Sequence, residues 1–518
     1  MGRVDRDSFG EISVPDDVLY GAHTQRSVEN FKISSHKISH EMIKSIASIK
    51  KACAKANNRL KLLDNKKAVS IVKACDFIVK GIRDENMDFF IENNEKALKK
   101  DNKTSIGKIL KTNNDEKIFE KNNKTNIGKT IKKGNELNNE KTKIIKNFPI
   151  DIFQAGSGTS TNMNVNEVIA NIASKISDEK IHPNDHVNMG QSTNNVFPTA
   201  IRISSLALAI GLLMEVKSIE KTFLKKSNEF KTILKAGRTH LQDAVPMTLG
   251  QEFHAYATAL GKDRTRIEDS LKYLRIVGIG GNAIGTGINT HPRFRFLIVE
   301  NLNKELKLNL EVTKDGIETT QFLTDIANLS SSLKMLAIDL NKICNDLRLL
   351  SSGPKTGFKE INLPAVEPGS SIMPGKINPS ILEAVNMVSM QAIGNDTTIT
   401  MAASQGNLEL NTFMPIISHN IIESLEILKS GIKTMNEKCI QGITANREIC
   451  TYYVENSASL ATALNPHLGY DLTASLVKEA LKTNKTIKQL IIEKKILSKE
   501  KVEKILNPSN LTKPNLKP

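Results

Sequence analysis

Two long series of regularly spaced apolar residues constrain the fold more than any other feature of this sequence. The first alternates steps of three and four residues without interruption: Ile326, Leu329, Leu333, Leu336, Leu340, Ile343, Leu347 and Leu350. The second skips one step at Asp263 and Arg264: Leu249, Phe253, Tyr256, Leu260, Ile267, Leu271 and Leu274. A repeat of 3.5 residues predicts helices that pack lengthwise against other helices.

The remaining sequence also favours a mainly α fold with a long central helical bundle. Parallel sheets require short Val and Ile runs that alternate with helices, and this pattern is absent from the sequence. Apolar seams of this length commonly continue from one subunit to the next. We therefore expect the protein to be an oligomer.

The chain of 518 residues is long enough for several domains. We expect an N-terminal domain at 1–190, a central helical-bundle domain at 191–446 and a small C-terminal helical domain at 447–518. Within the first domain, residues 86–147 contain 15 Lys against nine Asp and Glu, and the segment 102–111 recurs as 123–132. Because such a segment has few apolar residues to bury, we predict a disordered insertion at about 84–147.

Composition excludes several classes of function. The formal net charge is +16, but basic and aromatic residues do not interleave as they do in a platform for stacked bases, so we expect no nucleic-acid partner. The five cysteines show no metal-ligand spacing, and thiols of this kind fit a reducing compartment. The first residues lack an apolar signal core, and the longest apolar run, at 203–214, is too short to span a membrane. We expect a soluble cytoplasmic protein.

Four polar loops with nearby glycines interrupt the predicted helices, at 156–162, 192–195, 237–243 and 369–379. Their hydroxyl and amide groups, together with Lys376, could hold the two carboxylates of a small dicarboxylate. His240 is the best-placed titratable side chain, although an isolated histidine is more often structural. Glu383 is a possible partner for His240, although by itself it is typical of a helix start.

Residues 369–379 read Gly-Ser-Ser-Ile-Met-Pro-Gly-Lys-Ile-Asn-Pro, which resembles the signature GSSxMPxKxNP of the fumarase/aspartase superfamily. The segments 158–164, 192–194, 237–253 and 285–290 resemble the same superfamily. The resemblance covers the chain except for about 84–147. It implies a three-domain, mostly helical homotetramer whose active sites are each assembled from three subunits.

The resemblance also implies a role for each matching residue. Ser370 would be the catalytic base on a closing loop, and Glu383 would pair with His240. The substrate would be bound by Thr159, Ser192, Thr193, Asn194, Thr239, His240, Ser371, Lys376 and Asn378. The implied reaction removes a proton next to a carboxylate and passes through an aci-carboxylate intermediate. It requires no organic cofactor, and no metal ligands are expected; activation by a divalent cation stays open.

The leaving group separates two branches of the superfamily. The segments 342–354, 360–364, 393–402 and 442–446 resemble aspartases, whereas 21–27, 289–292 and 406–411 resemble fumarases. We expect the reversible deamination of L-aspartate to fumarate and ammonia, with the class II fumarate hydratase reaction as the alternative. A third possibility is a catalytically silent member that acts as a scaffold, with the Lys-rich insertion binding acidic polymers.

Two residues depart from the superfamily pattern. Asn195 stands where the superfamily usually has Asp, and Asn282 stands where it usually has Thr. Both substitutions keep a hydrogen-bonding side chain, so we expect activity to survive.

Overall fold

The computed structural model describes residues 2–82, 144–507 and 510–514. The chain divides into two compact units: unit 1 comprises 1–211, 269–331 and 394–425, and unit 2 comprises 212–268, 332–393 and 426–518. Long helices belong partly to each unit: α8 (Thr193–Glu229), α9 (Leu249–Leu274), α12 (Thr324–Leu350), α13 (Ser380–Ser404) and α14 (Met414–Lys438). The fold is mainly α, as the sequence predicts.

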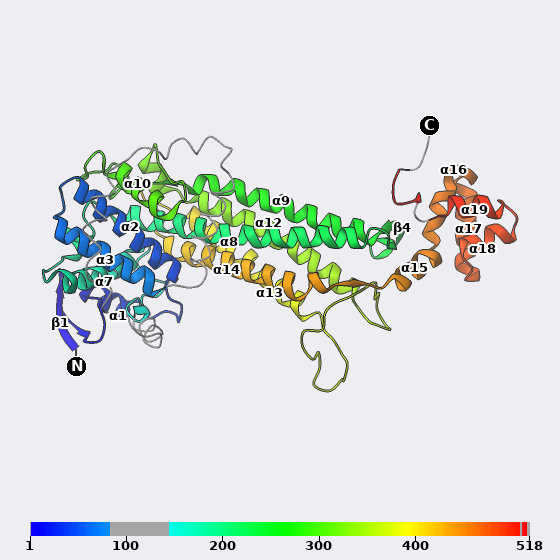
Figure 1. Cartoon of the computed structure of the whole chain (residues 1–518), viewed down its shortest axis with the longest axis horizontal. Coiled ribbons are helices and arrows are strands. Elements are labelled where there is room, and N and C mark those ends of the chain that lie inside the picture. The colour runs from blue at the N-terminus through cyan, green and yellow to red at the C-terminus, as the bar shows by residue number, and fades with distance from the viewer. Residues whose placement is uncertain (1, 83–143, 508–509, 515–518) are drawn as a thin grey trace, which may run out of the picture. The chain divides into compact units, whose positions relative to one another are not determined.

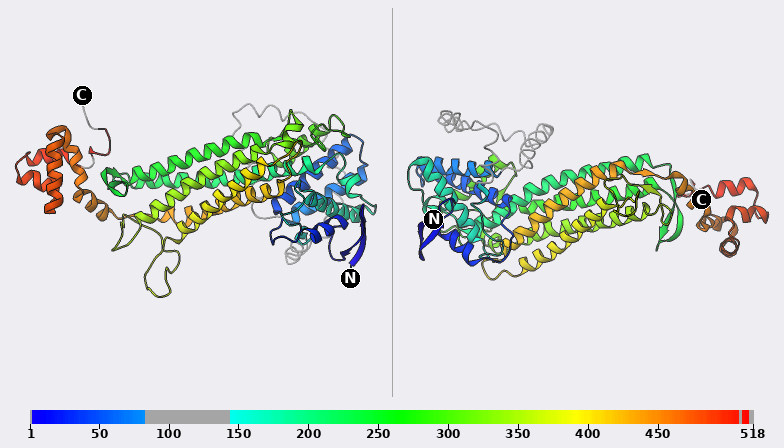
Figure 2. Two further views of the ribbon diagram at one scale, coloured as in Figure 1. Left: turned by 180° about the vertical axis from the view of Figure 1, so that it is seen from behind. Right: turned by 90° about the horizontal axis from the view of Figure 1, so that it is seen from below.

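Both predicted seams are confirmed as the buried faces of continuous helices. In α12, each of the eight apolar residues from Ile326 to Leu350 is at most 5% exposed. Helix α9 continues through the skipped step, where Asp263 occupies the buried position of the seam. Within unit 2, the segments of α8, α9, α12, α13 and α14 that belong to it run side by side (Figures 1 and 2).

Unit 1 is built on a group of short helices. Its elements are β1 (Gly2–Asp7), β2 (Gly10–Pro15), α1 (Ala22–Asn30), α2 (His40–Arg59), α3 (Asn65–Gly81), α7 (Thr159–Ser177), the π-helix η2 (Pro183–Val187), β5 (Ile276–Val277), α10 (Phe294–Leu306), β6 (Glu311–Val312) and α11 (Gly316–Gln321). Helix α2 packs against α3 and α10, and α3 packs against α7 (Figure 1). Ser39 and Asp64 start α2 and α3 because their side chains accept hydrogen bonds from first-turn N–H groups.

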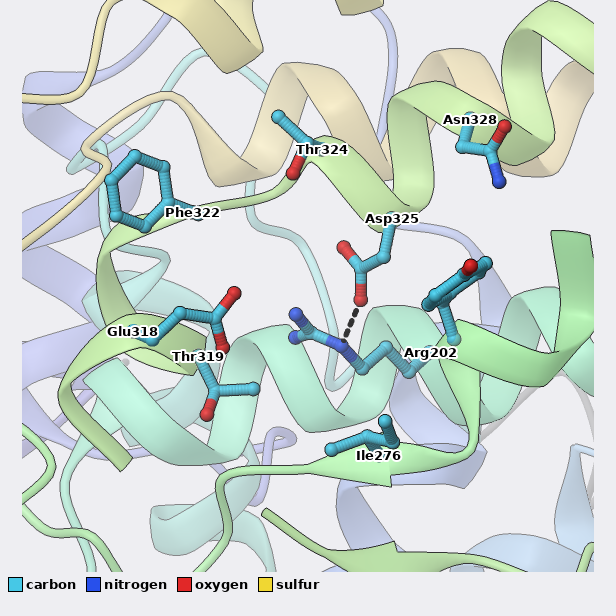
Figure 3. Close-up of a pocket in the computed structure, with 9 residues that line it drawn as sticks. Arg202, Ile276, Glu318, Thr319, Phe322, Thr324, Asp325 and Asn328 are labelled. Atoms are coloured by element: carbon cyan, nitrogen blue, oxygen red, sulfur yellow. Dashed lines mark hydrogen bonds and ion pairs between the residues drawn. The ribbon is translucent and has the colours of Figure 1, made fainter. Parts of the chain in front are cut away.

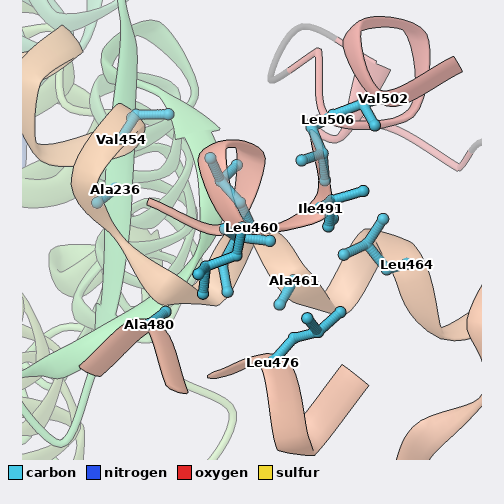
Figure 4. Close-up of a cluster of buried hydrophobic side chains, with 12 residues drawn as sticks. Ala236, Val454, Leu460, Ala461, Leu464, Leu476, Ala480, Ile491, Val502 and Leu506 are labelled. Atoms are coloured by element: carbon cyan, nitrogen blue, oxygen red, sulfur yellow. The ribbon is translucent and has the colours of Figure 1, made fainter. Parts of the chain in front are cut away.

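Unit 2 contains a β-hairpin and the C-terminal helices beside the long helices. Its further elements are β3 (Leu234–Thr239), β4 (Gln242–Thr248), β7 (Ile361–Asn362), the 3-10 helix η3 (Ile440–Gly442), β8 (Thr444–Ala445), α15 (Arg447–Asn456), the 3-10 helix η4 (Ala458–Leu464), α16 (Asn465–Leu468), α17 (Tyr470–Thr483), α18 (Ile487–Glu493) and α19 (Lys499–Ile505). The C-terminal helices share an apolar core that includes Leu464, Leu476, Ile491 and Val502 (Figure 4). Ala236 of β3 belongs to this core, so the hairpin and the C-terminal helices form one packed body.

The predicted insertion lies mostly outside the described residues, which resume at 144. Ile144 is buried, and Asn147 Oδ1 accepts a hydrogen bond from the Leu19 N–H at 2.6 Å. These contacts hold the end of the segment against the N-terminal residues. The extent of the predicted insertion at about 84–147 stays a prediction, because only its last four residues lie within the described chain.

Helix α8 is long and apolar enough to cross a membrane by length and hydropathy alone. However, 78% of that apolar stretch is buried inside the protein. Burial of this extent is typical of the core helix of a bundle. The apolar run at 203–214 lies within this helix.

Candidate active site

The residues expected to form the active site fall into two groups, one in each unit. Unit 1 contains Thr159 and the segment 192–195. Unit 2 contains Thr239, His240 and the segment 369–383. Each group has its own backbone framework.

Thr159 lies at the start of helix α7, and glycine makes this position possible. Gly158 precedes the helix with φ = 84°, a conformation that few other residues adopt. A Cβ atom there would also lie 2.3 Å from the Phe197 ring. Thr159 Oγ1 lies 2.8 Å from Ser157 Oγ. The expected loop at 156–162 is therefore shorter than predicted, because the helix begins at Thr159.

The segment 192–195 forms the start of helix α8, which begins at Thr193. Ser192 Oγ accepts a hydrogen bond from the Asn194 N–H at 3.2 Å, and Asn195 Oδ1 accepts one from the Ser192 N–H at 3.4 Å. Asn194 Nδ2 donates to the Ala283 carbonyl at 2.8 Å. Because this bond fixes the amide, Asn194 Oδ1 is left as an acceptor with no hydrogen-bond partner among the described residues.

The departure at Asn195 is visible in the hydrogen bonding. Asn195 is 1% exposed, and its Nδ2 has no hydrogen-bond partner within the described part of the chain. The carboxylate that the superfamily usually has here would carry an acceptor in place of this donor. The other departure, Asn282, adopts φ = 57° and donates to the Ile288 carbonyl at 2.6 Å. Its amide therefore supports a turn.

The loop 369–379 is closed by its own hydrogen bonds. The Gly369 N–H donates to the Lys376 carbonyl at 2.9 Å, and Asn378 Nδ2 donates to the Gly369 carbonyl at 2.7 Å. Ser370 Oγ accepts hydrogen bonds from the backbone N–H groups of Ile372 and Met373, both at 3.2 Å. Donors to the oxygen favour its ionised form, which is the form that acts as a base.

The loop also surrounds a space. A cavity of about 450 Å³ is lined by residues 365–370 and 373–377, among them Ser370 and Lys376. The predicted base and the predicted cation therefore line the same cavity. Ser371 and Ile372 are exposed beside it.

Thr239 and His240 lie at the tip of the β3–β4 hairpin. Thr239 pairs with Gln242, which leaves His240 and Leu241 as a two-residue turn with φ of 55° and 58°. Positive φ at both positions is the mark of a type I′ turn, where Asn and Gly are the usual residues. The polar loop expected at 237–243 is therefore a tight hairpin with exposed side chains at its tip.

The base of this hairpin is fixed by buried charges. Glu360 is fully buried and lies 2.8 Å from Arg238 Nη1 and 3.1 Å from Lys235 Nζ. The Arg238 guanidinium also lies 4.3 Å from the Phe358 ring centroid and 5.3 Å from that of Tyr453. These contacts hold the residue that precedes Thr239.

Glu383 lies in the first turn of α13, as predicted. Its carboxylate lies 3.8 Å from Arg348 Nη2 of α12, and no hydrogen bond or ion pair joins it to His240 within the described chain. The single chain does not bring Glu383 and His240 together as partners. Their pairing stays a prediction for the assembled protein.

A second cavity, of about 360 Å³, lies within unit 1 and contains none of the predicted site residues. Arg202 of α8 and Asp325 of α12 face each other in it, with 2.6 Å between Nε and Oδ2 (Figure 3). Burial raises the pKa of the nearby Glu318, and the positive charge of Arg202 opposes this shift. The ion pair gives the buried Arg202 guanidinium a partner of opposite charge, which explains the presence of both charged side chains in this cavity by structure alone.

Groups that could bind a metal are a separate question. Among the described residues, there is no cluster of three or more His, Cys, Asp and Glu side chains suited to a metal ion. The five cysteines are buried, and burial raises the pKa of the thiols of Cys53, Cys344, Cys439 and Cys450 to about 12. These thiols are therefore protonated at neutral pH.

The sequence alone did not identify the residues that hold the predicted site residues in place through hydrogen bonds. Lys50 donates a hydrogen bond to Asn188, four residues before Ser192, and Arg238 and Glu360 fix the hairpin. Lysines in a helical segment are ordinarily solvent-exposed, so the sequence contains no signal that singles out Lys50. Arg238 lies inside a superfamily motif, but its partner is 122 residues away.

Comparisons with known proteins identify the family to which the chain belongs. The lyase family model matches residues 10–136 and 116–394, and the model for the fumarase C C-terminus matches 460–513. An aspartate ammonia-lyase from Helicobacter pylori is 40% identical over 521 residues, covering 99% of this chain and 98% of the relative. A class II fumarate hydratase from the same species is 41% identical over 519 residues, covering 99% of each chain.

Solved structures are similar over the same length. A fumarate lyase:delta crystallin from Brucella melitensis, bound to cobalt, has a TM-score of 0.83 and 38% identity, covering 99% of this chain and 100% of that one. A class II fumarase from Schistosoma mansoni has a TM-score of 0.85 and 34% identity, covering 99% of each chain. Sequence motifs, fold and relatives thus lead to one conclusion: the chain belongs to the fumarase/aspartase superfamily of lyases.

Proposed function

We propose that the protein is an aspartate ammonia-lyase that converts L-aspartate reversibly to fumarate and ammonia. The observation that supports this most is the state of Ser370. Its oxygen accepts two backbone N–H donors and lines a cavity together with Lys376. A serine is a weak base at its ordinary pKa, and donors of this kind stabilise the alkoxide that the reaction requires.

The proposed reaction needs only groups of the chain itself. The Ser370 alkoxide takes the proton from Cβ of aspartate, and the electron pair moves into the adjacent carboxylate to form an aci-carboxylate. Lys376 and Asn378 hold this carboxylate, because its added negative charge is stabilised by strong donors. The electron pair then returns to form the double bond as the Cα–N bond breaks and the amine leaves as ammonia. We propose that no organic cofactor takes part.

The other end of the substrate is assigned to unit 1. Thr159, Ser192 and Thr193 would hold the second carboxylate, with Asn194 and His240 near the amino group. Asn194 is suited to receive an amine, because its Nδ2 is bound to the Ala283 carbonyl and its Oδ1 is left as an acceptor. An ammonium group has only donors, so it complements this oxygen.

The alternative is the class II fumarate hydratase reaction, which would use the same base on malate. The segments that resemble fumarases and the Helicobacter pylori relative of that name favour it. In this reaction His240 and Glu383 would organise the water. The aspartase-like segments at 342–354 and 393–402 lead us to prefer aspartate.

Purified full-length protein tests the proposal by the ultraviolet absorbance of fumarate. We expect fumarate to form from L-aspartate, and formation from malate alone would contradict the proposal. A protein active on neither substrate would support the scaffold hypothesis. That hypothesis further requires salt-sensitive RNA binding that is lost when residues 86–147 are deleted.

We further propose that the protein is a cytoplasmic homotetramer. The proposed assembly is supported by exposed apolar side chains on α12 and α13 within unit 2: Met335, Ile338, Met387 and Met390. Exposed apolar side chains that gather on neighbouring helices are typical of surfaces that another subunit covers.

A further inference from the structure

Two side chains of helix α2 donate hydrogen bonds to the segment immediately before Ser192. Lys50 Nζ donates a hydrogen bond to Asn188 Oδ1 at 2.7 Å. Two helical turns further along α2, Asn57 Nδ2 donates to the Met189 carbonyl at 3.1 Å. Residues spaced by seven lie on the same face of a helix, so one face of α2 contacts two consecutive residues of this segment.

Lys50 is an unusual residue for such a contact. It is 0% exposed, and Asn188 Oδ1 is its only hydrogen-bond partner within the described chain. Lys44, the neighbouring buried lysine of α2, pairs instead with the Glu41 carboxylate at 2.8 Å. An ammonium group without a buried counter-charge is costly, and burial lowers the pKa of Lys50 to about 7.

The titratable groups that act on Lys50 are the thiols of Cys53 on α2 and Cys75 on α3. Burial raises the pKa of both thiols well above its usual range, so both are neutral and supply no counter-charge. The Lys50 amine therefore lies in an interior that has no opposite charge to offset its own. Burying the amine there costs stability, and the contacts that the amine makes must account for its presence.

Asn188 connects that amine to both substrate-binding segments of unit 1. Asn188 Nδ2 donates to the Gln191 carbonyl at 3.1 Å, directly before Ser192. Asn188 Oδ1 also lies 3.4 Å from Asn162 Nδ2, which is three residues after Thr159 in helix α7. Helices α2 and α7 and the segment 188–191 thus meet at one carboxamide.

We propose that Lys50 is a positioning residue of the active site, which fixes Thr159, Ser192 and Thr193 relative to each other through Asn188. The inference rests on the proposed function, because it assumes that these residues bind one carboxylate of the substrate. Lys50 does not touch the substrate. Its loss should therefore weaken substrate binding and leave the chemical step at Ser370 largely intact.

The test compares Lys50→Met with Ser45→Ala in the full-length enzyme. Methionine keeps the length and apolar stem of the side chain and removes the donor. Ser45 lies on the same helix, and its hydroxyl is 2.7 Å from Ser204 Oγ without contacting the segment 188–191. Both variants therefore lose one buried hydrogen bond from α2, but only one of them loses the contact to Asn188.

We expect Lys50→Met to raise KM for aspartate about three- to tenfold, the loss expected for one hydrogen bond, with kcat changed less than about twofold. Ser45→Ala should leave both constants within about twofold. The melting temperature of Lys50→Met should not fall below that of Ser45→Ala, because an uncharged side chain replaces a buried amine. An unchanged KM in Lys50→Met would overturn the inference, and so would a fall in kcat with KM constant.

Asn188→Ala provides a second, independent measurement. It should raise KM at least as much as Lys50→Met, and the double variant should be no worse than Asn188→Ala alone, because both changes remove the same connection. If Lys50→Met does not fold, an unchanged KM in Asn188→Ala still overturns the inference. Additive effects of the two changes would do the same.

Failure of the proposed function is distinguishable from failure of this inference. The wild-type rate on aspartate tests the former, and the ratio of variant to wild-type KM tests the latter. If the wild-type enzyme acts on malate instead, the same variants are compared with malate. The proposed effect of Lys50 concerns Thr159, Ser192 and Thr193, which are assigned to the second carboxylate that aspartate and malate share.

Discussion

At the scale of single residues, Ser370 shows how far the sequence could go. The signature at 369–379 identified the loop and its serine, because glycine, proline and the polar side chains occur there in a specific order. It could not show that two backbone N–H groups donate to the serine oxygen, since those contacts depend on how the loop closes. The resemblance to the superfamily also implies that Glu383 pairs with His240. In the single chain Arg348 lies beside Glu383, and the pairing with His240 stays a prediction.

Replacing Ser370 by alanine tests its role as the base. We expect kcat to fall by about 10²- to 10⁴-fold, the usual contribution of a positioned base, with the circular dichroism spectrum unchanged. Ser380→Ala is the matched control. Ser380 lies ten residues after Ser370, and its buried hydroxyl has no hydrogen-bond partner among the described residues. Equal activity in the two variants would exclude Ser370 as the base.

Asp263 gives a prediction about pH. Burial, with the neighbouring Asp339 carboxyl, raises the pKa of Asp263 to about 7, against the opposing effect of Arg266. Between about pH 4 and pH 7 the folded chain therefore holds a proton that the unfolded chain has released. The free energy of unfolding should fall as pH rises through this range and level off above about pH 7.

Asp263→Asn removes this titration, because the amide stays neutral. We expect the free energy of unfolding of the variant to exceed that of wild type at pH 8, and to exceed it by less at pH 5. Unfolding by urea at both pH values measures this difference. Asp269→Asn, at an exposed position near the end of the same helix, should show no such difference. A gain of equal size at both pH values would refute the assignment.

At the scale of elements, the long helices were predictable and the hairpin was not. The seams of α9 and α12 follow from apolar periodicity, which depends on local sequence and is therefore visible in it. The β3–β4 hairpin has His240 and Leu241 at a turn that usually takes Asn and Gly, so its sequence lacks the ordinary signal. Its stability comes from distant partners, chiefly Glu360 and the C-terminal core around Ala236.

Glu360→Ala tests this dependence of the hairpin on buried charge. Removing the carboxylate leaves Arg238 without its ion-pair partner, while Lys235 keeps the Glu252 carboxylate at 2.7 Å. The loss should cost about 3–5 kcal/mol in the free energy of unfolding. Glu268→Gln, which alters an exposed ion pair with Arg264, should cost less than about 1 kcal/mol. Chemical denaturation of both variants decides the matter, and equal losses would contradict the account.

At the scale of the whole molecule, family and fold class were predictable, whereas the three domain boundaries stay a prediction. The two compact units cut through α8, α9, α12, α13 and α14, because these helices extend from one unit into the other. A boundary of this kind leaves no linker or change of composition in the sequence. The two groups of predicted site residues belong to different units for the same reason.

The proposed assembly has a direct test in solution. Light scattering coupled to size-exclusion chromatography should give four times the mass of one chain. Replacing Met387 and Met390 by lysine should reduce that mass, because both side chains are exposed and apolar on α13 and charges there oppose burial. A monomer of full activity would contradict the expectation that the site is shared among subunits.

The central claim is that this lyase releases an amine, and one comparison tests it most directly. The initial rate of fumarate formation is measured by absorbance with purified wild-type protein, first with L-aspartate and then with malate, at equal concentrations. We predict that fumarate forms from aspartate with stoichiometric release of ammonia and that the rate with malate is at least about tenfold lower. Faster formation of fumarate from malate than from aspartate would contradict the claim.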